Sequence, residues 1–200
     1  FFAYGRRVFL GRAVSLSVNA AGMGYAVPGT VIAVGVIIPF AWFDNSLDAW
    51  TRATFDWSTG LLLSGTLVAL MFAYLVRFLA VSLQTVEAGL AKIRPSMDEA
   101  ARSMGYGPMR MLHRVHVPML RGALLTALLL VFVDVLKELP ATLILRPFNF
   151  NTLAVRAYEL ASDERLADSA PAALTIVLAG LLPVILISRS ITLSRHVQPA

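Results

Sequence analysis

Long apolar stretches alternate with shorter polar segments along the 200 residues, and this pattern predicts a membrane protein. A helix needs roughly 20 apolar residues to cross a bilayer. The first candidate span is short and is interrupted by Pro28, Gly29 and Pro39. The second contains Arg77, which we expect to reach the interface from near a helix end. Four stretches satisfy or nearly satisfy the length, and they cover residues 27–43, 61–80, 119–139 and 171–188. We therefore expect an all-α, polytopic helix bundle with about four transmembrane helices.

Composition supports this reading and excludes several kinds of chemistry. The chain is 58% hydrophobic and 14% charged, whereas soluble domains carry about 25% charged residues. The lack of cysteine excludes disulfides, thiolate metal sites and cysteine nucleophiles. The sequence G-x-x-x-x-G-K-[ST] is also missing, so the chain has no P-loop for ATP hydrolysis. We expect no catalytic residue, no metal site and no cofactor bound by this chain. For His113 and His116, we expect a surface or docking role.

Basic residues cluster in particular connecting segments, and this clustering predicts the side of the membrane on which each lies. Segments 1–25, 81–121 and the tail after 188 carry most of the arginines and lysines, so we place them in the cytoplasm. Segment 44–60 is acidic and rich in tryptophan, so we place it outside, together with 140–170. The net charge of +5 therefore reflects membrane topology, and we expect no nucleic-acid partner.

The cytoplasmic segment 95–118 has the signals of two short helices. Ser96 and Glu99 are spaced as a capping box just after Pro95, so we expect a helix over about 97–104. Gly105 offers a left-handed stop, and Pro108 suits the first turn of a second helix. We expect that second helix to end at Pro118, where the third span begins. The result would be a compact helix-turn-helix below the membrane.

The same segment resembles the EAA loop of ABC-importer permeases. That pattern is E-A-A, three residues, Gly, nine residues, and an aliphatic-x-aliphatic-Pro ending. The matching positions are Glu99, Ala100, Ala101, Gly105, Val115, Val117 and Pro118. The resemblance implies that this loop docks on an ABC ATPase subunit, which would use the ATP. The ATPase-coupling residues that it implies are Glu99, Ala100, Ala101, Gly105, Val115 and Pro118. Small Ala100 and Ala101 would permit close approach.

Ionisable residues near the outer end of the third span form a second candidate site. Asp134, Lys137 and Glu138 are three and four positions apart, so they would share one face of a helix. Such residues in a span usually face a pathway or a partner. This face could therefore line a translocation path. Alternatively, Asp134 and Lys137 form a self-satisfied pair at the membrane interface.

Residues 137–164 resemble the second half of ferric-iron-type permeases. They contain K-E-L-P-A-T-L-I-L-R-P-F, then T-L-A and Y-E-L, while G-Y-A-V-P-G-T-V at 24–31 resembles an earlier part of that family. The resemblance implies a translocation path that includes Asp134, Lys137, Glu138 and Thr142, with ferric iron as substrate. Thiamine, phosphonate, sulfate or polyamine is the alternative cargo. Oxygen ligands for iron could also come from 158–164, although a solvated helix explains that segment better.

The resemblance also implies several partners. They are ABC ATPase subunits, a substrate-binding protein outside the membrane, a second permease half or subunit, and the lipid bilayer. We expect this chain to be the C-terminal part of a longer inner-membrane permease, because it has one EAA-like loop and lacks an initial Met. The alternative is a short subunit that dimerises. A proton-coupled carrier that uses Asp134, Lys137 and Glu138 is the competing function.

Overall fold

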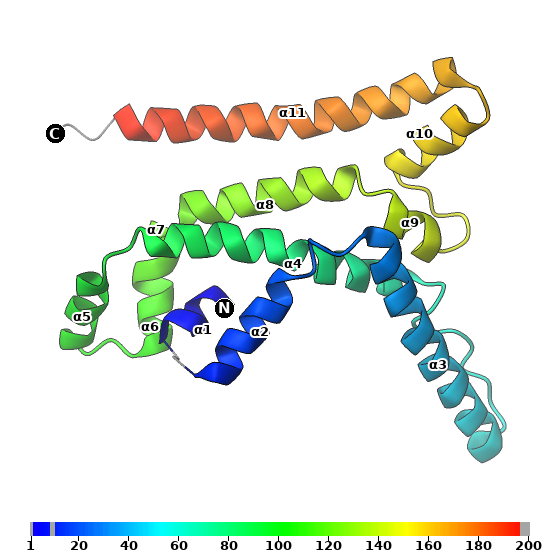
Figure 1. Ribbon diagram of the computed structural model, residues 1–200, viewed down its shortest axis with the longest axis horizontal. Coiled ribbons are helices and arrows are strands. Elements are labelled where there is room, and N and C mark those ends of the chain that lie inside the picture. The colour runs from blue at the N-terminus through cyan, green and yellow to red at the C-terminus, as the bar shows by residue number, and fades with distance from the viewer. Residues whose placement is uncertain (1, 9–10, 197–200) are drawn as a thin grey trace. The chain divides into compact units, whose positions relative to one another are not determined.

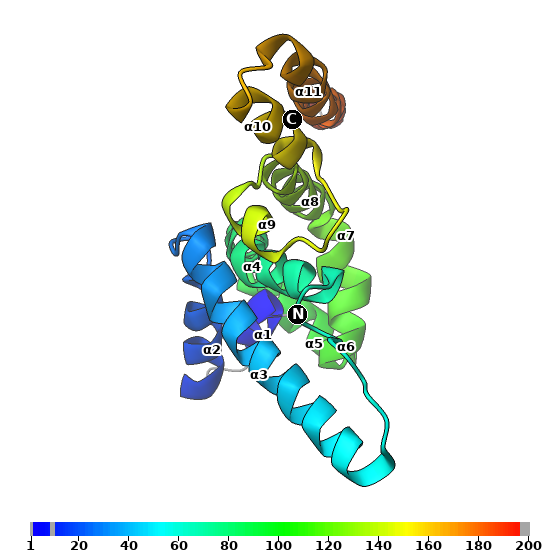
Figure 2. The same ribbon diagram turned by 90° about the vertical axis from the view of Figure 1, so that its right-hand side faces the viewer.

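The computed structural model describes residues 2–8 and 11–196, and every regular element in those ranges is a helix (Figures 1 and 2). The side chains of Arg189 and Arg195, which support the cytoplasmic placement of the tail, lie outside the described part. The helices are α1 (Phe2–Val8), α2 (Arg12–Gly22), α3 (Gly29–Phe55), α4 (Leu67–Ala91), α5 (Pro95–Ser103), α6 (Pro108–Met111), a π-helical turn (Leu112–His116), α7 (Val117–Met119), α8 (Arg121–Leu136), α9 (Pro140–Leu145), α10 (Leu153–Ser162) and α11 (Leu166–His196).

Three helices are long and apolar enough to cross a membrane, and a bent helix pair could supply a fourth span. The three are α3, α4 and residues 166–185 of α11. The bent pair consists of 108–119 and α8, which meet at an angle of 75°. The all-α membrane fold is therefore confirmed. The observed helices overlap the four predicted spans, but they begin and end at different residues.

α3 shows the largest departure from the expected bounds. It continues through Pro39 to Phe55, so much of the predicted outer loop 44–60 is helical. Asp44 accepts hydrogen bonds from the Leu63 and Ser64 amides, at 3.1 and 2.7 Å. Asp48, one helical turn later, accepts from the Ser58 hydroxyl at 2.7 Å. These two carboxylates hold the following loop along the helix (Figure 2), which the local sequence signals did not reveal.

The chain divides into two compact units, and each has its own core. One unit comprises residues 25–78 and 133–180. Its core joins α3, the first half of α4, and α9. Many of the core side chains are small, which allows helix backbones to approach closely. The buried residues are Ile32, Ala33, Val36, Ala69, Leu70, Ala73, Ala141 and Leu145.

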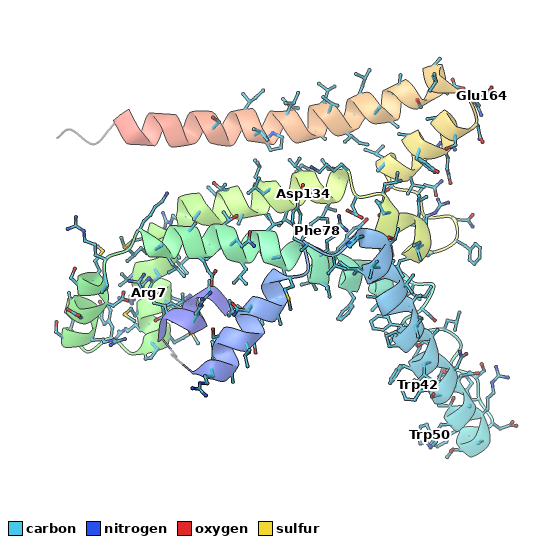
Figure 3. The ribbon with its side chains drawn as sticks, viewed as in Figure 1. Arg7, Trp42, Trp50, Phe78, Asp134 and Glu164 are labelled. Carbon is cyan, nitrogen blue, oxygen red and sulfur yellow. The ribbon has the colours of Figure 1, made fainter. Side chains whose placement is uncertain are left out.

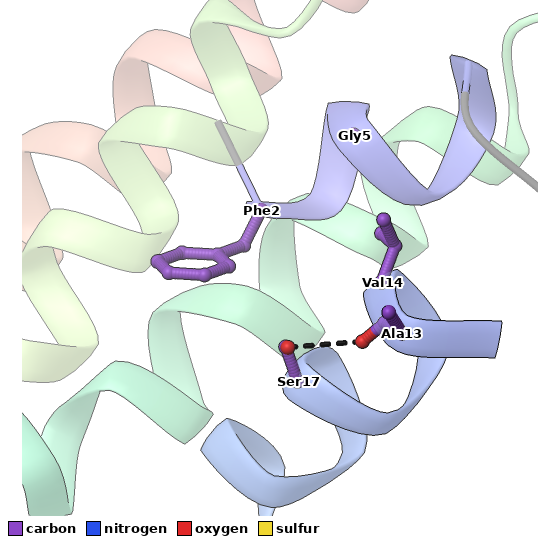
Figure 4. A pocket seen from close by; sticks show the side chains of 5 residues that line it. All are labelled: Phe2, Gly5, Ala13, Val14 and Ser17. Carbon is purple, nitrogen blue, oxygen red and sulfur yellow. Dashed lines mark hydrogen bonds between the residues drawn. The ribbon is translucent and has the colours of Figure 1, made fainter. Parts of the chain in front are cut away.

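The other unit comprises residues 1–24, 79–132 and 181–200. α1, α2 and the second half of α4 pack together with Ile93, just after α4, and Leu120, just before α8. The buried residues are Ala3, Val18, Leu83, Leu90, Ile93 and Leu120. A Cβ at Gly89 would lie 2.6 Å from that of Ala123, so a glycine is needed where α4 meets α8. An apolar hollow of about 340 Å³ lies between α1 and α2. Figure 4 shows the residues that line it, Phe2, Gly5, Ala13, Val14 and Ser17.

Candidate coupling loop and buried charge pairs

α5 begins at Pro95, and its start differs from the predicted capping box. Arg94 precedes the first helical residue, and no side chain caps the helix start. The prediction that Ser96 and Glu99 form a reciprocal cap is wrong, because Pro95 takes the first helical position and leaves Ser96 inside the helix. Asp98 lies in the first turn, where the helix dipole favours a negative charge.

Gly105 ends α5 in the manner predicted. Its φ is +77°, a left-handed conformation that glycine adopts without steric penalty. The Gly105 amide donates to the Arg102 carbonyl at 2.9 Å, and the Tyr106 amide donates to the Ala101 carbonyl at 3.0 Å. These two bonds form a Schellman motif. Pro108 then stands in the first turn of α6, so the predicted pair of short helices is confirmed.

The second helix of the loop is irregular and runs slightly beyond Pro118. A π-helical turn covers Leu112–His116, and α7 continues to Met119 before the chain bends at Leu120. Pro118 lacks an amide donor, so it interrupts the regular hydrogen bonding close to this bend. The bend separates α6–α7 from α8, which is the part of the pair that matches the third predicted span.

The EAA-like residues divide into an exposed face and a buried support. Glu99 and Ala100 are exposed, whereas Ala101 is 1% exposed and packs with Tyr4, Met111 and Leu112. Gly105 and Pro118 are also exposed, and Val115 is partly buried against the same cluster. Three exposed methionines, Met97, Met104 and Met109, lie on the same pair of helices. The loop thus presents small and adaptable side chains outward from a packed base.

Arg7 of α1 binds the base of this loop (Figure 3). Its guanidinium donates to the Asp98 carboxylate at 2.7 Å and to the carbonyls of Leu90 and Ile93 at 2.7 and 2.8 Å. All three guanidinium nitrogens therefore have partners on α4, the following turn, or α5. In the sequence, Arg7 is one of the basic residues that place segment 1–25 in the cytoplasm. Its partners lie more than 80 positions away, so no local pattern could identify them.

His116 lies in the same buried network, and its predicted surface role is wrong. It is 0% exposed, whereas His113 is exposed as expected. Its Nε2 lies 3.1 Å from the Asp98 carboxylate, and its ring stacks at a tilt on Tyr4. Burial lowers the pKa of His116 below its usual value, although Asp98 opposes that shift. Burial also raises the pKa of Tyr4, with a further contribution from the Asp98 charge.

The three charges at the end of the third predicted span do not share one face. Lys137 pairs with Asp134 at 3.0 Å, and its side chain is 64% exposed. Glu138 is buried and pairs with Arg77 of α4 at 3.3 Å. α8 ends at Leu136, so helical periodicity no longer relates Glu138 to Asp134. The expectation that Arg77 reaches the membrane interface is also wrong, because it pairs with Glu138 inside its unit.

Glu138 and Thr142 organise the contact between three helices. One Glu138 oxygen accepts from the Ala141 amide at 3.2 Å. Thr142 is fully buried and shares a hydrogen bond with the Tyr74 hydroxyl of α4. A Cβ at Gly29 of α3 would lie 2.6 Å from Arg77 and 2.8 Å from Glu138. Whether these groups line a path stays a prediction.

The possible oxygen ligands of segment 158–164 lie around the end of α10. Glu159 binds Arg146 at 2.8 Å and lies 3.9 Å from Arg156, so this carboxylate is already paired. Asp163 and Glu164 follow α10 in a turn, where Glu164 has a φ of +61°. Among the described residues, no three acidic or histidine side chains form a group that could hold a metal ion.

Residues 2–197 match the family model for the inner membrane component of binding-protein-dependent transport systems. The chain belongs to this family. It is therefore a multi-pass inner membrane component, in agreement with its helices and with the resemblance read from the EAA-like loop.

Two relatives are described as transport permeases, and neither description names an enzyme. A Fe(3+)-transport system permease protein, FbpB 2 of Haemophilus influenzae, is 27% identical over 82% of this chain and 29% of its own length. A putative 2-aminoethylphosphonate transport system permease protein, PhnV of Salmonella typhimurium, is 29% identical over 78% of this chain and 52% of its own length. The chain thus spans about half or less of the length of these relatives.

Proposed function

We propose that this chain forms part of the translocation path of an ABC importer and receives its driving force through the 95–118 loop. ATP hydrolysis would take place on separate ATPase subunits, and a binding protein outside the membrane would deliver the substrate. The observation that supports this best is the division of the EAA-like residues. Glu99 and Ala100 are exposed on top of the buried Ala101, and Gly105 holds the turn beside them.

The connections of the loop support a simple mechanism. A three-residue segment, 92–94, joins α4 to α5, and only Leu120 separates α7 from α8. A displacement of the loop by the ATPase would therefore move the ends of two candidate spans. Repeated displacement would open the path alternately to each side of the membrane, which is the mechanism we propose.

Substitutions at Glu99 and Gly105 test the docking role. Gly105→Arg should uncouple ATP hydrolysis from uptake in the assembled transporter, because a long side chain would stand at the docking face in a strained conformation. Gly107→Arg is the matched control, since Gly107 is also exposed but has an ordinary negative φ. Uptake and membrane insertion would be measured together. Normal uptake by the Gly105→Arg protein would overturn the docking role.

The proposed cargo is ferric iron, and 2-aminoethylphosphonate is the main alternative. The K-E-L-P run and the iron-permease relative favour iron, while the phosphonate-permease relative has similar identity. Liposomes that contain the transporter and its binding protein would be offered radioactive ferric iron or 2-aminoethylphosphonate. Uptake of the phosphonate alone would exclude iron while leaving the permease role intact.

A proton-coupled carrier is the competing function. Asp134, Lys137 and Glu138 motivate it, because ionisable groups inside a membrane often belong to proton relays. Uptake by this protein without an ATPase, in an imposed proton gradient, would support the carrier. Recovery of an ATPase subunit with the purified protein, together with ATP-dependent uptake, would support the importer.

A further inference from the structure

The N-terminal helix α1 contacts both helices of the loop and the end of α4. Arg7 contacts α4 through the Leu90 carbonyl and α5 through the Asp98 carboxylate. Tyr4, one turn earlier, donates its hydroxyl to the Pro108 carbonyl of α6 at 2.8 Å. The side chains of one short helix thus connect three segments that are far apart from it in the sequence.

Arg7 adds hydrogen bonds to two carbonyls at and just after the end of α4. The Leu90 carbonyl, near the end of α4, also accepts from the Ile93 amide at 3.0 Å, and Ile93 itself lies two residues beyond α4. A cation is favourable at such an end because of the helix dipole. The guanidinium donates to both carbonyls and simultaneously binds a carboxylate in the first turn of the next helix. Lysine could not reproduce this planar arrangement of donors.

The contact of Arg7 with Asp98 is largely buried, whereas the neighbouring Arg6 makes a more exposed pair with Glu87. The side chains of Arg7 and Asp98 are 19% and 13% exposed. Those of Arg6 and Glu87 are 49% and 29% exposed, and their pair is longer, at 3.3 Å. Exposed pairs contribute little to stability, while charge-assisted bonds away from water contribute more. Arg6 is therefore an internal control for Arg7 on the same helix.

We propose that α1 is a third part of the coupling unit and that Arg7 is the positioning residue that makes the end of α4, α5 and α1 move as one body. This inference rests on the proposed importer function. When the ATPase displaces the loop, the Arg7 bonds would carry the displacement to α1 and to the end of α4. Without the Arg7 bonds, a displacement of the loop would move α1 and the end of α4 by less than it moves the loop itself.

The first test measures the amount of substrate moved per ATP hydrolysed by the complete transporter in liposomes. In Arg7→Gln protein, the loss of charge-assisted bonds should shift the equilibrium between joined and separated α1 by about tenfold or more. Uptake per ATP should then fall several-fold, while Arg7→Lys retains part of it. Arg6→Gln should couple like the original protein, because its pair is exposed.

Three outcomes separate this inference from the importer proposal. If the unaltered transporter shows no ATP-dependent uptake, the importer function itself fails. If the unaltered transporter couples, and Arg7→Gln merely lowers the yield of assembled protein with the same uptake per ATP, Arg7 is structural only and the inference is overturned. If Arg6→Gln lowers uptake per ATP as much as Arg7→Gln, the effect is one of general charge and the inference is again overturned.

A second test follows the movement directly and remains usable if Arg7→Gln assembles poorly. These 200 residues contain no cysteine, so two introduced cysteines can carry spin labels once native cysteines elsewhere in the transporter have been replaced. Phe2 and Ser103 are suitable positions because both are exposed, one on α1 and the other at the end of α5. The distance between the labels should stay the same in the nucleotide-free and ATP-trapped transporter. It should become broadly distributed in Arg7→Lys protein. A clear change of the distance on ATP trapping in the unaltered protein would overturn the inference.

Discussion

Two largely buried arginine–carboxylate pairs, one in each compact unit, differ in how completely they are hydrogen-bonded. The arginine side chains of Arg7–Asp98 and Arg77–Glu138 are equally exposed, at 19%. Arg7 uses all three nitrogens at 2.7–2.8 Å. Arg77 lies 3.3 Å from Glu138, its Nε makes no hydrogen bond among the described residues, and its Nη1 donates to the Val27 carbonyl at a long 3.5 Å. Two arginines of equal exposure therefore make contacts of different completeness.

The difference shows what each pair can contribute. Arg7 binds backbone carbonyls as well as a carboxylate, so it fixes the end of α4 and the start of α5 relative to α1. Arg77 balances one charge with another inside an apolar core, where either charge alone would be costly. The second pair depends mainly on the presence of both partners, whereas the first depends on the geometry of the guanidinium.

Removing one member of the Arg77–Glu138 pair should cause the largest loss of stability. Glu138→Ala leaves a buried guanidinium without its counter-ion, which costs about 3–5 kcal/mol. The double variant Arg77→Met, Glu138→Met should recover most of that loss, because no uncompensated charge remains. Thermal unfolding in detergent would measure both. If the double variant is as unstable as the single one, the pair contributes through its hydrogen bonds rather than through charge balance.

Removing Arg7 should have the next largest effect on stability. Arg7→Gln loses charge-assisted bonds to three partners, and we expect a loss of about 1.5–3 kcal/mol. Arg6→Gln removes the same charge from the same helix at an exposed pair, and it should cost about 0–1 kcal/mol. The free energies of unfolding of the Arg7→Gln and Arg6→Gln proteins, measured under the same conditions, test this difference. Equal stability of the two would contradict a special role for the buried contact.

Gly29 tests how closely the Arg77–Glu138 pair is packed. In Gly29→Ala, the new methyl group would lie 2.6 Å from Arg77 and 2.8 Å from Glu138, so the pair must shift. Overpacking of this kind costs about 1–3 kcal/mol. Gly35→Ala on the same helix meets no atom within 4 Å, and it should be neutral or stabilising. A Gly29→Ala protein as stable as Gly35→Ala would show that the pair moves aside freely.

The smallest expected effect is a pH dependence that arises from the Arg7 network. The pKa of His116 is lowered by burial in the folded protein, so the unfolded chain takes up a proton at higher pH than the folded one. The stabilising contribution is therefore complete above about pH 6.5 and is lost as the pH falls below it. Asp98, Arg7 and Tyr4 face this ring, and Asp98 reduces the effect. His116→Gln should flatten the dependence of unfolding temperature on pH between 5 and 7, measured against His113→Gln. Equal slopes would exclude His116 as the titrating group.

The sequence alone determined features that depend on near neighbours in the chain. Apolar length predicted the membrane helices, and the spacing of Gly105 and Pro108 predicted the turn between α5 and α6. Both depend on properties that act over a few residues, namely transfer to a bilayer and the permitted backbone conformations. The spacing of Ser96 and Glu99 wrongly predicted that Ser96 caps α5. The cap position depends on which residue comes first in the helix, and here that residue is Pro95.

Only the tertiary structure decided which charges meet. Arg77 and Glu138 lie 61 positions apart in the sequence, and Arg7 and Asp98 lie 91 positions apart. The Arg77–Glu138 pair depends on close packing at Gly29, where a Cβ would lie 2.6 Å from Arg77 and 2.8 Å from Glu138. Sequence patterns report which residues can share one helix. A buried charge is tolerated only where another helix places an opposite charge beside it. The two pairs could therefore be identified only from the tertiary structure.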